Sequence, residues 1–311
     1  MLQFTNNNKR YHTFDYEMKK RFGEKVGKIA LDAGFTCPNR DGKIGVGGCL
    51  FCSESGSGDF AENRNLDIKI QIENGKKKVK EKWQNINKFI AYFQPFSNTY
   101  NSVSVLRKLY FDTCQTEGIV GVFIATRCDC INEEIATLLS ELSGKTFLVV
   151  ELGLQTSCDA TLEAMNVGYN TAQFLSCFEL LKSKNINVCI HTIIGLPNEN
   201  YQDFIKTANF VAKLNPFAIK IHMLHILKNT GLNTLYERTN FAILSKDEYV
   251  EIVCDIIEIL PPSVVIERLT GDGAHDILVA PMWTKRKREC LNSIDKTLNF
   301  RNSWQGVKNI L

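Results

Sequence analysis

The stretch TFLVVELGLQ, residues 146–155, is almost continuously apolar. Apolar runs of this length, bounded by polar turns, are typical of strands that are buried on both faces of a parallel sheet. Similar runs occur on both sides of it in the sequence, at 25–32, 88–94, 118–126, 186–195 and 217–224. The sequence therefore predicts six strands.

Segments with helical spacing separate these strands, at 68–84, 103–115, 131–142, 171–184 and 201–214. Asn132 and Asn200 stand where helix N-caps are expected. A repeated strand–helix order with apolar strands favours a parallel sheet covered by helices, either doubly wound or closed into a barrel. After it, the sequence predicts a helix at 244–260, then a turn, a strand and a polar loop at 261–272, and a basic, less periodic tail at 281–311.

The composition is that of a soluble globular protein, with 44% hydrophobic and 23% charged residues among 311. No apolar run is long enough to span a membrane, and the first residues lack the apolar core of a secretory signal. We therefore expect a cytoplasmic protein without a membrane partner. The eleven cysteines favour reduced thiols over a disulfide framework. The net charge is only +3, but basic side chains concentrate at 75–82 and 285–288.

Three cysteines, Cys37, Cys49 and Cys52, lie in the glycine-rich stretch TCPNRDGKIGVGGCLFC, residues 36–52, directly after the first predicted strand. The carboxyl ends of strands carry the chemistry of α/β barrels. Structural zinc usually takes four ligands, and no fourth Cys or His follows at pairing distance. Three thiolates suit a [4Fe–4S] cluster whose remaining iron is open to S-adenosylmethionine (SAM). Incidental thiols are the alternative.

The C-x11-C-x2-C loop, with Phe51 before its last cysteine, resembles the cluster loop of radical SAM enzymes, in the expanded spacing of the Elongator catalytic subunit and its bacterial relatives. Further segments resemble the small radical SAM proteins of the YhcC/YtqA type: LDAGFTCPNRDG, GGCLFC, ELGLQT, HTIIGLPNE, IHMLHILKNTGL and ERLTGD. The resemblance implies an α/β fold with a partial (β/α)6 TIM-like barrel at 25–260, after an N-terminal segment at 1–24. A short C-terminal extension at 261–311 is a candidate contact for substrate or RNA.

The resemblance implies an enzyme in which a reduced [4Fe–4S] cluster cleaves SAM to a 5′-deoxyadenosyl radical, which takes a hydrogen atom from the substrate. Cys37, Cys49 and Cys52 match the cluster ligands. The residues that match or are candidates for SAM contacts are Phe51, Gln94, Arg127, Glu151, Gln155, His191 and His222. Arg127 is a candidate for the SAM carboxylate or a substrate anion, and His191 could instead be a satisfied core histidine. The segment NVGYN, 166–170, departs from the family, which commonly has a SAM-binding arginine there.

Two further groups of residues are candidates for chemistry. The segment ERLTGDGAHD, 267–276, is dense in polar side chains beside a glycine turn, and a plain surface loop is the alternative. The candidate catalytic residues in it, which would cap the substrate opening, are Glu267, Arg268, Asp272 and His275. Cys128 and Cys130 are close enough in sequence to suggest a second metal site, although two cysteines alone are a weak signal.

The Elongator-like resemblance points to tRNA as the substrate, at the C5 side chain of the wobble uridine, with conversion of a carboxymethylaminomethyl to an aminomethyl group. Elongator's own reaction needs an acetyltransferase domain, for which this chain leaves no room. The expected tRNA contacts are Lys285, Arg286, Lys287 and Arg288, and the expected electron donor is a flavodoxin or ferredoxin. Two alternatives remain: a radical SAM enzyme acting on a small metabolite or peptide, and a non-enzymatic metal-binding or Fe–S protein.

Overall fold

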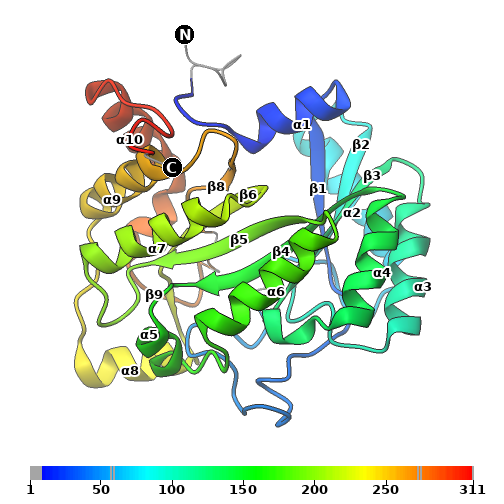
Figure 1. Cartoon of the computed structure of the whole chain (residues 1–311), viewed down its shortest axis with the longest axis horizontal. Coiled ribbons are helices and arrows are strands. Elements are labelled where there is room, and N and C mark those ends of the chain that lie inside the picture. The colour runs from blue at the N-terminus through cyan, green and yellow to red at the C-terminus, as the bar shows by residue number, and fades with distance from the viewer. Residues whose placement is uncertain (1–8, 57, 59, 272, 274, 310–311) are drawn as a thin grey trace.

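The computed structural model describes residues 9–56, 58, 60–271, 273 and 275–309, in which strands and helices alternate (Figure 1). The strands are β1 (Val26–Leu31), β2 (Lys88–Phe93), β3 (Ile119–Thr126), β4 (Phe147–Gln155), β5 (Asn187–Ile194), β6 (Ala218–Met223), β7 (Ile226–Leu227), β8 (Val265–Arg268) and β9 (Leu278–Ala280). The α-helices are α1 (Phe14–Phe22), α2 (Ile68–Lys82), α3 (Val103–Cys114), α4 (Glu133–Ser143), α5 (Asp159–Ala164), α6 (Thr171–Ser183), α7 (Tyr201–Leu214), α8 (Gly231–Thr239), α9 (Lys246–Ile259) and α10 (Lys287–Phe300). Two short 3-10 helices are η1 (Cys128–Cys130) and η2 (Met282–Arg286).

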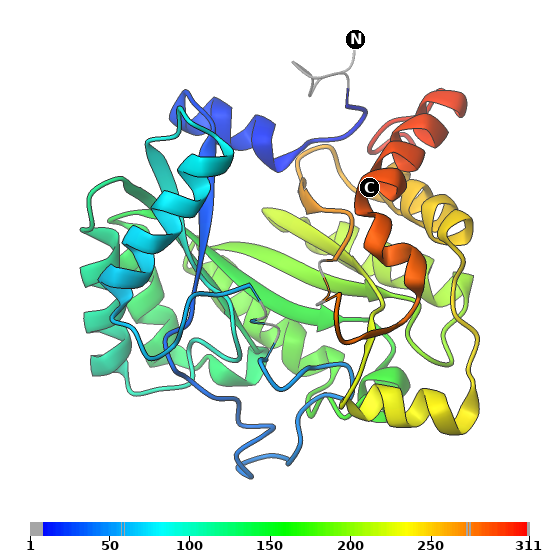
Figure 2. The same ribbon diagram turned by 180° about the vertical axis from the view of Figure 1, so that it is seen from behind.

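The main sheet has seven strands in the order β1-β2-β3-β4-β5-β6-β8, and every neighbouring pair is parallel. The sheet curls into a half-barrel with helices on its outer face, as Figures 1 and 2 show from opposite sides. This confirms the six predicted strands and the partial barrel, and excludes the doubly wound alternative. The segment predicted as a C-terminal extension supplies the seventh strand, β8.

Side chains of the strands alternate between two apolar cores. The larger core lies between the sheet and the outer helices. The smaller one lines the inner face at the amino ends of the strands. Its buried members include Ile90, Phe123, Val149, Cys189 and Val265, and Met18 of α1 packs among them. Because successive side chains of a strand point to opposite faces, the inner face continues two residues later along a strand. On β2, β4 and β5 this brings the polar side chains of Tyr92, Glu151 and His191 after the apolar Ile90, Val149 and Cys189.

The N-terminal segment spans the gap between the two edge strands of the half-barrel. Thr13 forms a parallel bridge with Ile266 of β8, and the backbone N–H of Ile266 donates to the carbonyl of His12 at 2.7 Å. Helix α1 contacts both β1 and β8. The bottom of the half-barrel is therefore covered, and the opposite end of the strands remains available for a site.

Local capping signals agree with the sequence. The side chains of Asn132 and Asn200 cap α4 and α7, as predicted. The tail differs from its prediction, because α10 is a regular helix whose Cys290, Ile294 and Leu298 are buried at intervals of four residues, and α10 packs against α9. Charged residues between these positions hide the period in the sequence. In the part of the chain that is described, no helix is long and apolar enough to cross a membrane.

Candidate active site

A cavity of about 270 Å³ opens at the carboxyl ends of the strands. The loop after β1 and the ends of β2 to β6 and β8 contribute to its lining. It brings together all three cysteines of the predicted cluster loop and every residue predicted to contact SAM. These residues are Cys37, Cys49, Cys52, Phe51, Gln94, Arg127, Glu151, Gln155, His191 and His222.

The cysteine loop, residues 37–52, is held by hydrogen bonds to the segment after β4. Asn39 donates through Nδ2 to the carbonyl of Asn166 at 2.6 Å, and Asn166 donates back to the carbonyl of Gly48 at 2.8 Å. The N–H of Leu50 donates to the carbonyl of Met165 at 3.0 Å. These contacts fix the loop across the cavity, because both of its halves are tied to the same turn.

Glycine is required at two positions of this loop. Gly48 has φ +81°, and a Cβ there would lie 2.8 Å from Nε of Arg40. A Cβ on Gly45 would lie 2.2 Å from Oδ1 of Asn39. The guanidinium of Arg40 in turn donates to the carbonyls of Cys52 and Ser53. The glycines therefore permit the close packing that sets the two ends of the loop beside each other.

The donor set fits an iron–sulfur cluster. Three thiols line one cavity, and sulfur is the ligand that such clusters take. Within the described ranges, no three His, Cys, Asp or Glu side chains are arranged to hold a single metal ion. Each cysteine of a [4Fe–4S] cluster binds a different iron, so its ligands need not converge on one point. Cys128 and Cys130 are buried, and no third ligand joins them among the described residues, so nothing in the structure supports the suggested second metal site.

The thiol of Cys49 sits in a mixed environment. Burial, followed by the neighbouring Cys52, raises its pKa to about 12, while Arg127 and Asn39 act in the opposite direction. Nη1 of Arg127 lies 3.9 Å from its sulfur, and Nδ2 of Asn39 lies 3.7 Å from it. Both groups are donors, so they are placed to stabilise a thiolate once a cationic metal centre displaces the proton.

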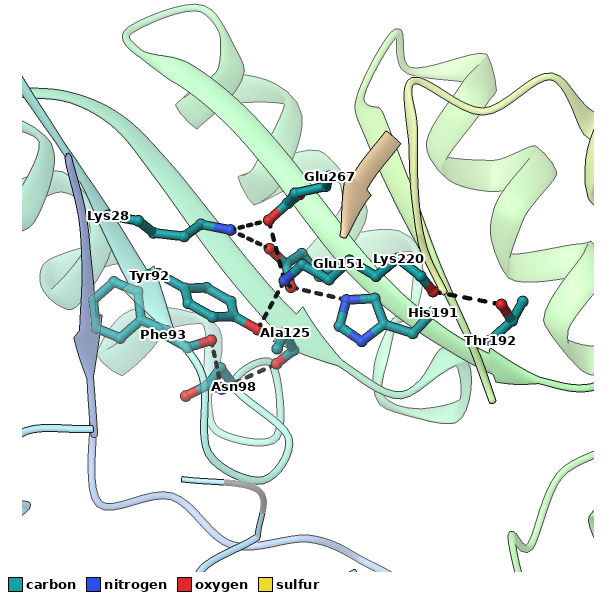
Figure 3. Close-up of polar contacts among 10 residues, drawn as sticks. All are labelled: Lys28, Tyr92, Phe93, Asn98, Ala125, Glu151, His191, Thr192, Lys220 and Glu267. Atoms are coloured by element: carbon teal, nitrogen blue, oxygen red, sulfur yellow. Dashed lines mark hydrogen bonds and ion pairs between the residues drawn. The ribbon is translucent and has the colours of Figure 1, made fainter. Parts of the chain in front are cut away.

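Below the cysteines, a buried charge layer crosses the inside of the half-barrel (Figure 3). It consists of Lys28, Glu151, Lys220 and Glu267, from β1, β4, β6 and β8. Lys28 donates to Glu151 at 2.8 Å and also to Glu267. Lys220 bonds Glu151 and lies 3.2 Å from Glu267. Two lysines thus match two carboxylates across the interior.

The charge layer also positions two neighbouring rings, and Figure 3 shows both beside it. Nε2 of His191 lies 2.8 Å from Oε2 of Glu151, and Nζ of Lys220 lies 3.3 Å from the Tyr92 hydroxyl. The ammonium groups of Lys28 and Lys220 lie 4.2 and 4.5 Å from the centre of the Tyr92 ring. Both oxygens of Glu151 are therefore bonded inside the protein, which argues against its predicted role as a direct SAM ligand.

Electrostatics keep Glu151 and Lys220 of the charge layer ionised. Burial opposes ionisation of Glu151, but Lys220 and Lys28 outweigh it and hold the pKa of that carboxyl well below its ordinary value. Burial likewise disfavours the charged form of Lys220, but Glu151 and Glu267 raise its pKa. For His191, burial and then Lys220 lower the pKa, although Glu151 partly offsets them. The layer is thus a set of matched charges beside a neutral imidazole.

Arg127 lies at the cysteine side of the cavity. Its guanidinium makes two hydrogen bonds to Asp129, at 2.9 and 2.7 Å, and packs 4.8 Å from the centre of the Tyr169 ring. Tyr169 belongs to the NVGYN segment, lines the cavity and donates its hydroxyl to the carbonyl of Gly153 at 2.8 Å. Arg127, directly after β3, therefore packs against the 166–170 turn. This is the turn in which an arginine was expected from the resemblance and is missing.

The candidate catalytic residues do not gather at the opening. Glu267 is buried in the charge layer, Arg268 lines the cavity, and His275 is exposed and lies apart from the cavity lining. Asp272 lies outside the described residues. The predicted tRNA contacts at 285–288 also lie apart from the lining, on the segment that leads from β9 into α10 (Figure 2).

Sequence reasoning missed Lys28, Lys220 and Tyr92. Each lies in a strand that was identified correctly, and a lysine within an otherwise apolar, buried strand is an unusual feature. That feature would have found both lysines, since Lys28 and Lys220 interrupt the runs at 25–32 and 217–224. His225 also lines the cavity and packs against Gly271 and Gly273.

Comparison with known proteins agrees with this geometry. The profile of the Radical SAM superfamily matches residues 37–211, and that of the Radical_SAM C-terminal domain matches residues 216–299. YtqA of Bacillus subtilis (strain 168) is 44% identical over 97% of this chain and 94% of its own length. YhcC of Escherichia coli (strain K12) is 32% identical over 92% of this chain and 91% of its own length.

Among solved structures, the archaeal Methanocaldococcus infernus Elp3, lacking residues 1–46, superimposes with a TM-score of 0.68. The match covers 90% of this chain and 64% of the archaeal chain, at 16% identity. At that identity the likeness shows a shared fold. The resemblance drawn from the cysteine loop and the later motifs is thus confirmed. The chain belongs to the radical SAM superfamily, in the group that contains YtqA and YhcC, and is an enzyme that uses a [4Fe–4S] cluster and SAM.

Proposed function

We propose that Cys37, Cys49 and Cys52 hold the cluster and that SAM lies against the cysteine side of the cavity. Phe51, Gln94, Arg127 and Gln155 line the cavity there or at the neighbouring strand ends and are its proposed contacts. The bound cofactors supply abstraction of a hydrogen atom from the substrate. The hydrogen bond between Glu151 of the charge layer and the neighbouring His191 holds the cavity wall beside these contacts in place.

The proposed substrate is tRNA, and the proposed reaction converts a carboxymethylaminomethyl group at C5 of the wobble uridine into an aminomethyl group. The 5′-deoxyadenosyl group would take one hydrogen atom from the carboxymethyl carbon and the cluster would take back one electron. Water would then hydrolyse the resulting C=N bond, so that the two-carbon unit leaves as glyoxylate and the amine stays on the uridine. Such a base must leave its stack to reach a recessed site, as single-stranded loop bases can. The proposed setting is the cytoplasm, with a flavodoxin or ferredoxin as electron donor. Residues 1–24, 25–260 and 261–311 are the proposed N-terminal segment, barrel and substrate-contacting extension.

The charge of the cavity lining supports this proposal. Among the described lining residues, Arg40, Arg127, Lys220 and Arg268 are cationic, whereas Glu151 is the carboxylate. Asp129 balances Arg127 and the charge layer balances Lys220, so Arg40 and Arg268 are the cations that remain. An excess of positive charge in a concave site favours anionic substrates. A nucleotide that carries both a phosphate backbone and a carboxylate fits this charge better than a neutral metabolite.

Mass spectrometry of nucleosides tests the proposal. Cells that lack the gene should accumulate carboxymethylaminomethyluridine in tRNA and lose aminomethyluridine and its derivatives. Purified enzyme with cluster, SAM and a reductant should then restore the aminomethyl group in that tRNA. Unchanged nucleosides in the deletion strain, together with cleavage of SAM by the purified protein, would reject tRNA and favour a small metabolite or peptide.

A further inference from the structure

A second polar region of the cavity lies on β5, β6 and β8, away from the cysteine loop. We call it the histidine wall and define it as His191, His222 and Arg268, all of which line the cavity. The two imidazole rings lie 5.3 Å apart. The wall therefore combines a guanidinium with two imidazoles on neighbouring strands.

His222 carries an unused hydrogen-bonding atom. Its Nε2 is buried and has no partner among the described residues. His191, by contrast, bonds Glu151 through its Nε2 at 2.8 Å. Leaving a buried polar atom without a partner is unfavourable, so such an atom beside a cavity indicates that a ligand completes it.

The surroundings of His222 are electrostatically suited to an anion. Burial lowers the pKa of His222 well below its ordinary value, and His191, Arg268, Lys220 and His225 add to the effect. The ring is therefore neutral, and the described groups that lower its pKa are two basic side chains and two imidazoles. Glu151 and Glu267 do not cancel this positive charge, because both carboxylates are paired with lysines of the charge layer. An entering anion would meet a guanidinium and a free N–H donor together.

We propose that His222 and Arg268 form a subsite that binds a carboxylate of the substrate. Guanidinium groups bind carboxylates in a two-pronged geometry, and Nε2–H of His222 can donate a further hydrogen bond. The inference rests on the proposed function, because the carboxymethylaminomethyl group ends in a carboxylate that its aminomethyl product lacks. The subsite would thus distinguish substrate from product and favour release of the product.

SAM also carries a carboxylate, but its expected place is elsewhere. The amino-carboxylate of SAM fills the open iron, which must lie near the cysteines that hold the cluster. Arg127, 3.9 Å from the Cys49 sulfur, and Arg40 of the cysteine loop are cations at that side. The histidine wall lies on the strands at the other edge of the sheet, β5, β6 and β8. It is therefore available to a second molecule while SAM is bound.

Acetate tests the subsite without tRNA. In the SAM-loaded holoenzyme with isotope-labelled histidine, acetate should shift the His222 ring resonances and raise the pKa of His222, whereas the neutral isostere acetamide should do neither. Arg268→Gln should weaken acetate binding about tenfold, because one charge-assisted interaction is removed. His222→Gln, which retains an N–H donor, should weaken it less. The control Arg107→Gln changes an exposed arginine on α3 and should have no effect.

Anticodon stem-loops extend the test to the proposed substrate. Wild-type enzyme should bind the carboxymethylaminomethyl form about tenfold more tightly than its methyl ester, and Arg268→Gln should lose this preference. Acetate that competes with SAM, or that binds Arg268→Gln as tightly as wild type, would overturn the subsite. If tRNA is modified without any preference for the carboxylate, the inference fails and the proposed function stands. If acetate binds as expected but tRNA is not modified, the subsite stands and the tRNA proposal fails.

Discussion

The cysteine loop and the buried charge layer meet in one cavity but are built in opposite ways. The loop is a backbone turn in which Cys37 is buried and the other two cysteines are partly exposed, and it is held by hydrogen bonds from Asn39 and Asn166. The charge layer is carried on strands, and Lys220 and Glu151 in it are almost fully buried. The loop therefore depends on residue type at fixed spacing, whereas the layer depends on matched charges inside the sheet. Changes in the loop should affect chemistry, and changes in the layer should affect folding.

Loss of a loop cysteine should produce the largest effect. Cys49→Ala should abolish cluster assembly and SAM cleavage, because three thiolates are the proposed ligands. Its thermal unfolding should stay close to that of wild-type protein purified without iron. Iron and sulfide analysis after anaerobic reconstitution measures this. Cys114→Ala is the matched control, since Cys114 is a partly exposed cysteine of α3, and it should keep a full cluster. Equal iron content in both variants would contradict the ligand assignment.

Loss of one lysine of the charge layer should instead destabilise the fold. Lys220→Met leaves the buried Glu151 with less compensation and should cost about 3–5 kcal/mol of unfolding free energy. Lys28→Met should cost less, because the Lys28 side chain is 22% exposed and that of Lys220 only 4%. Urea denaturation measures both. The double variant with Glu151→Gln should recover part of the loss. An equal loss of unfolding free energy in both variants would contradict the expectation that the more buried ion pair contributes more.

Two buried carboxyls sharpen the comparison through pH. Glu151 has lysine partners and a lowered pKa. The stability that its ionised form contributes is fully present above its ordinary pKa of 4.5 and is lost as the pH falls from there through the lowered pKa. Glu199 follows β5, accepts a hydrogen bond from Thr156, and has no lysine among the causes of its shift. Burial raises its pKa from 4.5 to about 7, although Thr156 and Thr161 act against it.

The sign for Glu199 is therefore the reverse. The folded state binds the extra proton between pH 4.5 and about 7, so stability should fall as the pH rises through that window. Glu199→Gln should remove this slope and stabilise the protein at pH 8 by at most roughly 3 kcal/mol. Unfolding free energies at several pH values measure it. A slope that persists in Glu199→Gln would assign the titration to another group.

Surface charge should have the smallest effect, limited to binding. Replacing Lys285, Arg286, Lys287 and Arg288 with glutamine should flatten the salt dependence of tRNA affinity, by roughly 0.7–0.9 in the log–log slope for each phosphate that is no longer neutralised. SAM cleavage without substrate should be unchanged. The matched control replaces exposed lysines of α2, Lys77, Lys80 and Lys82. An equal change in slope for both sets would show that neither run binds tRNA specifically.

The fold could be predicted largely from the sequence because the inner strands of the sheet, β2 to β6, are mostly apolar runs buried on both faces. The strand at 146–155 shows this best, since its only charged residue is Glu151. Helix α10 could not be predicted in the same way. Its three buried residues are separated by charged and polar ones, and its place against α9 is set by tertiary packing.

The site likewise contains residues that local sequence predicts and residues that only the tertiary structure brings together. Cysteine spacing is local, so Cys37, Cys49 and Cys52 could be recognised from one loop. The charge layer forms only when distant strands pair, and no local pattern indicates that Lys28 will meet Glu267. Glu151 was recognised as important, but its lysine partners were not, and those partners change its interpretation from a SAM ligand to a structural anion.

The N-terminal segment that bridges β1 and β8 has a consequence for synthesis on the ribosome. Lys28 and Glu267 are separated by 239 positions, and Thr13 must wait for Ile266 before their bridge can form. Chains emerge at about 5–20 residues per second, so the first strand exists for at least ten seconds or so before its final partners appear. During that interval β6 has an unpaired edge and the interior lysines lack part of their counter-charge. The nascent chain is therefore expected to need protection from aggregation until β8 is made, and to complete its half-barrel only after that strand has emerged.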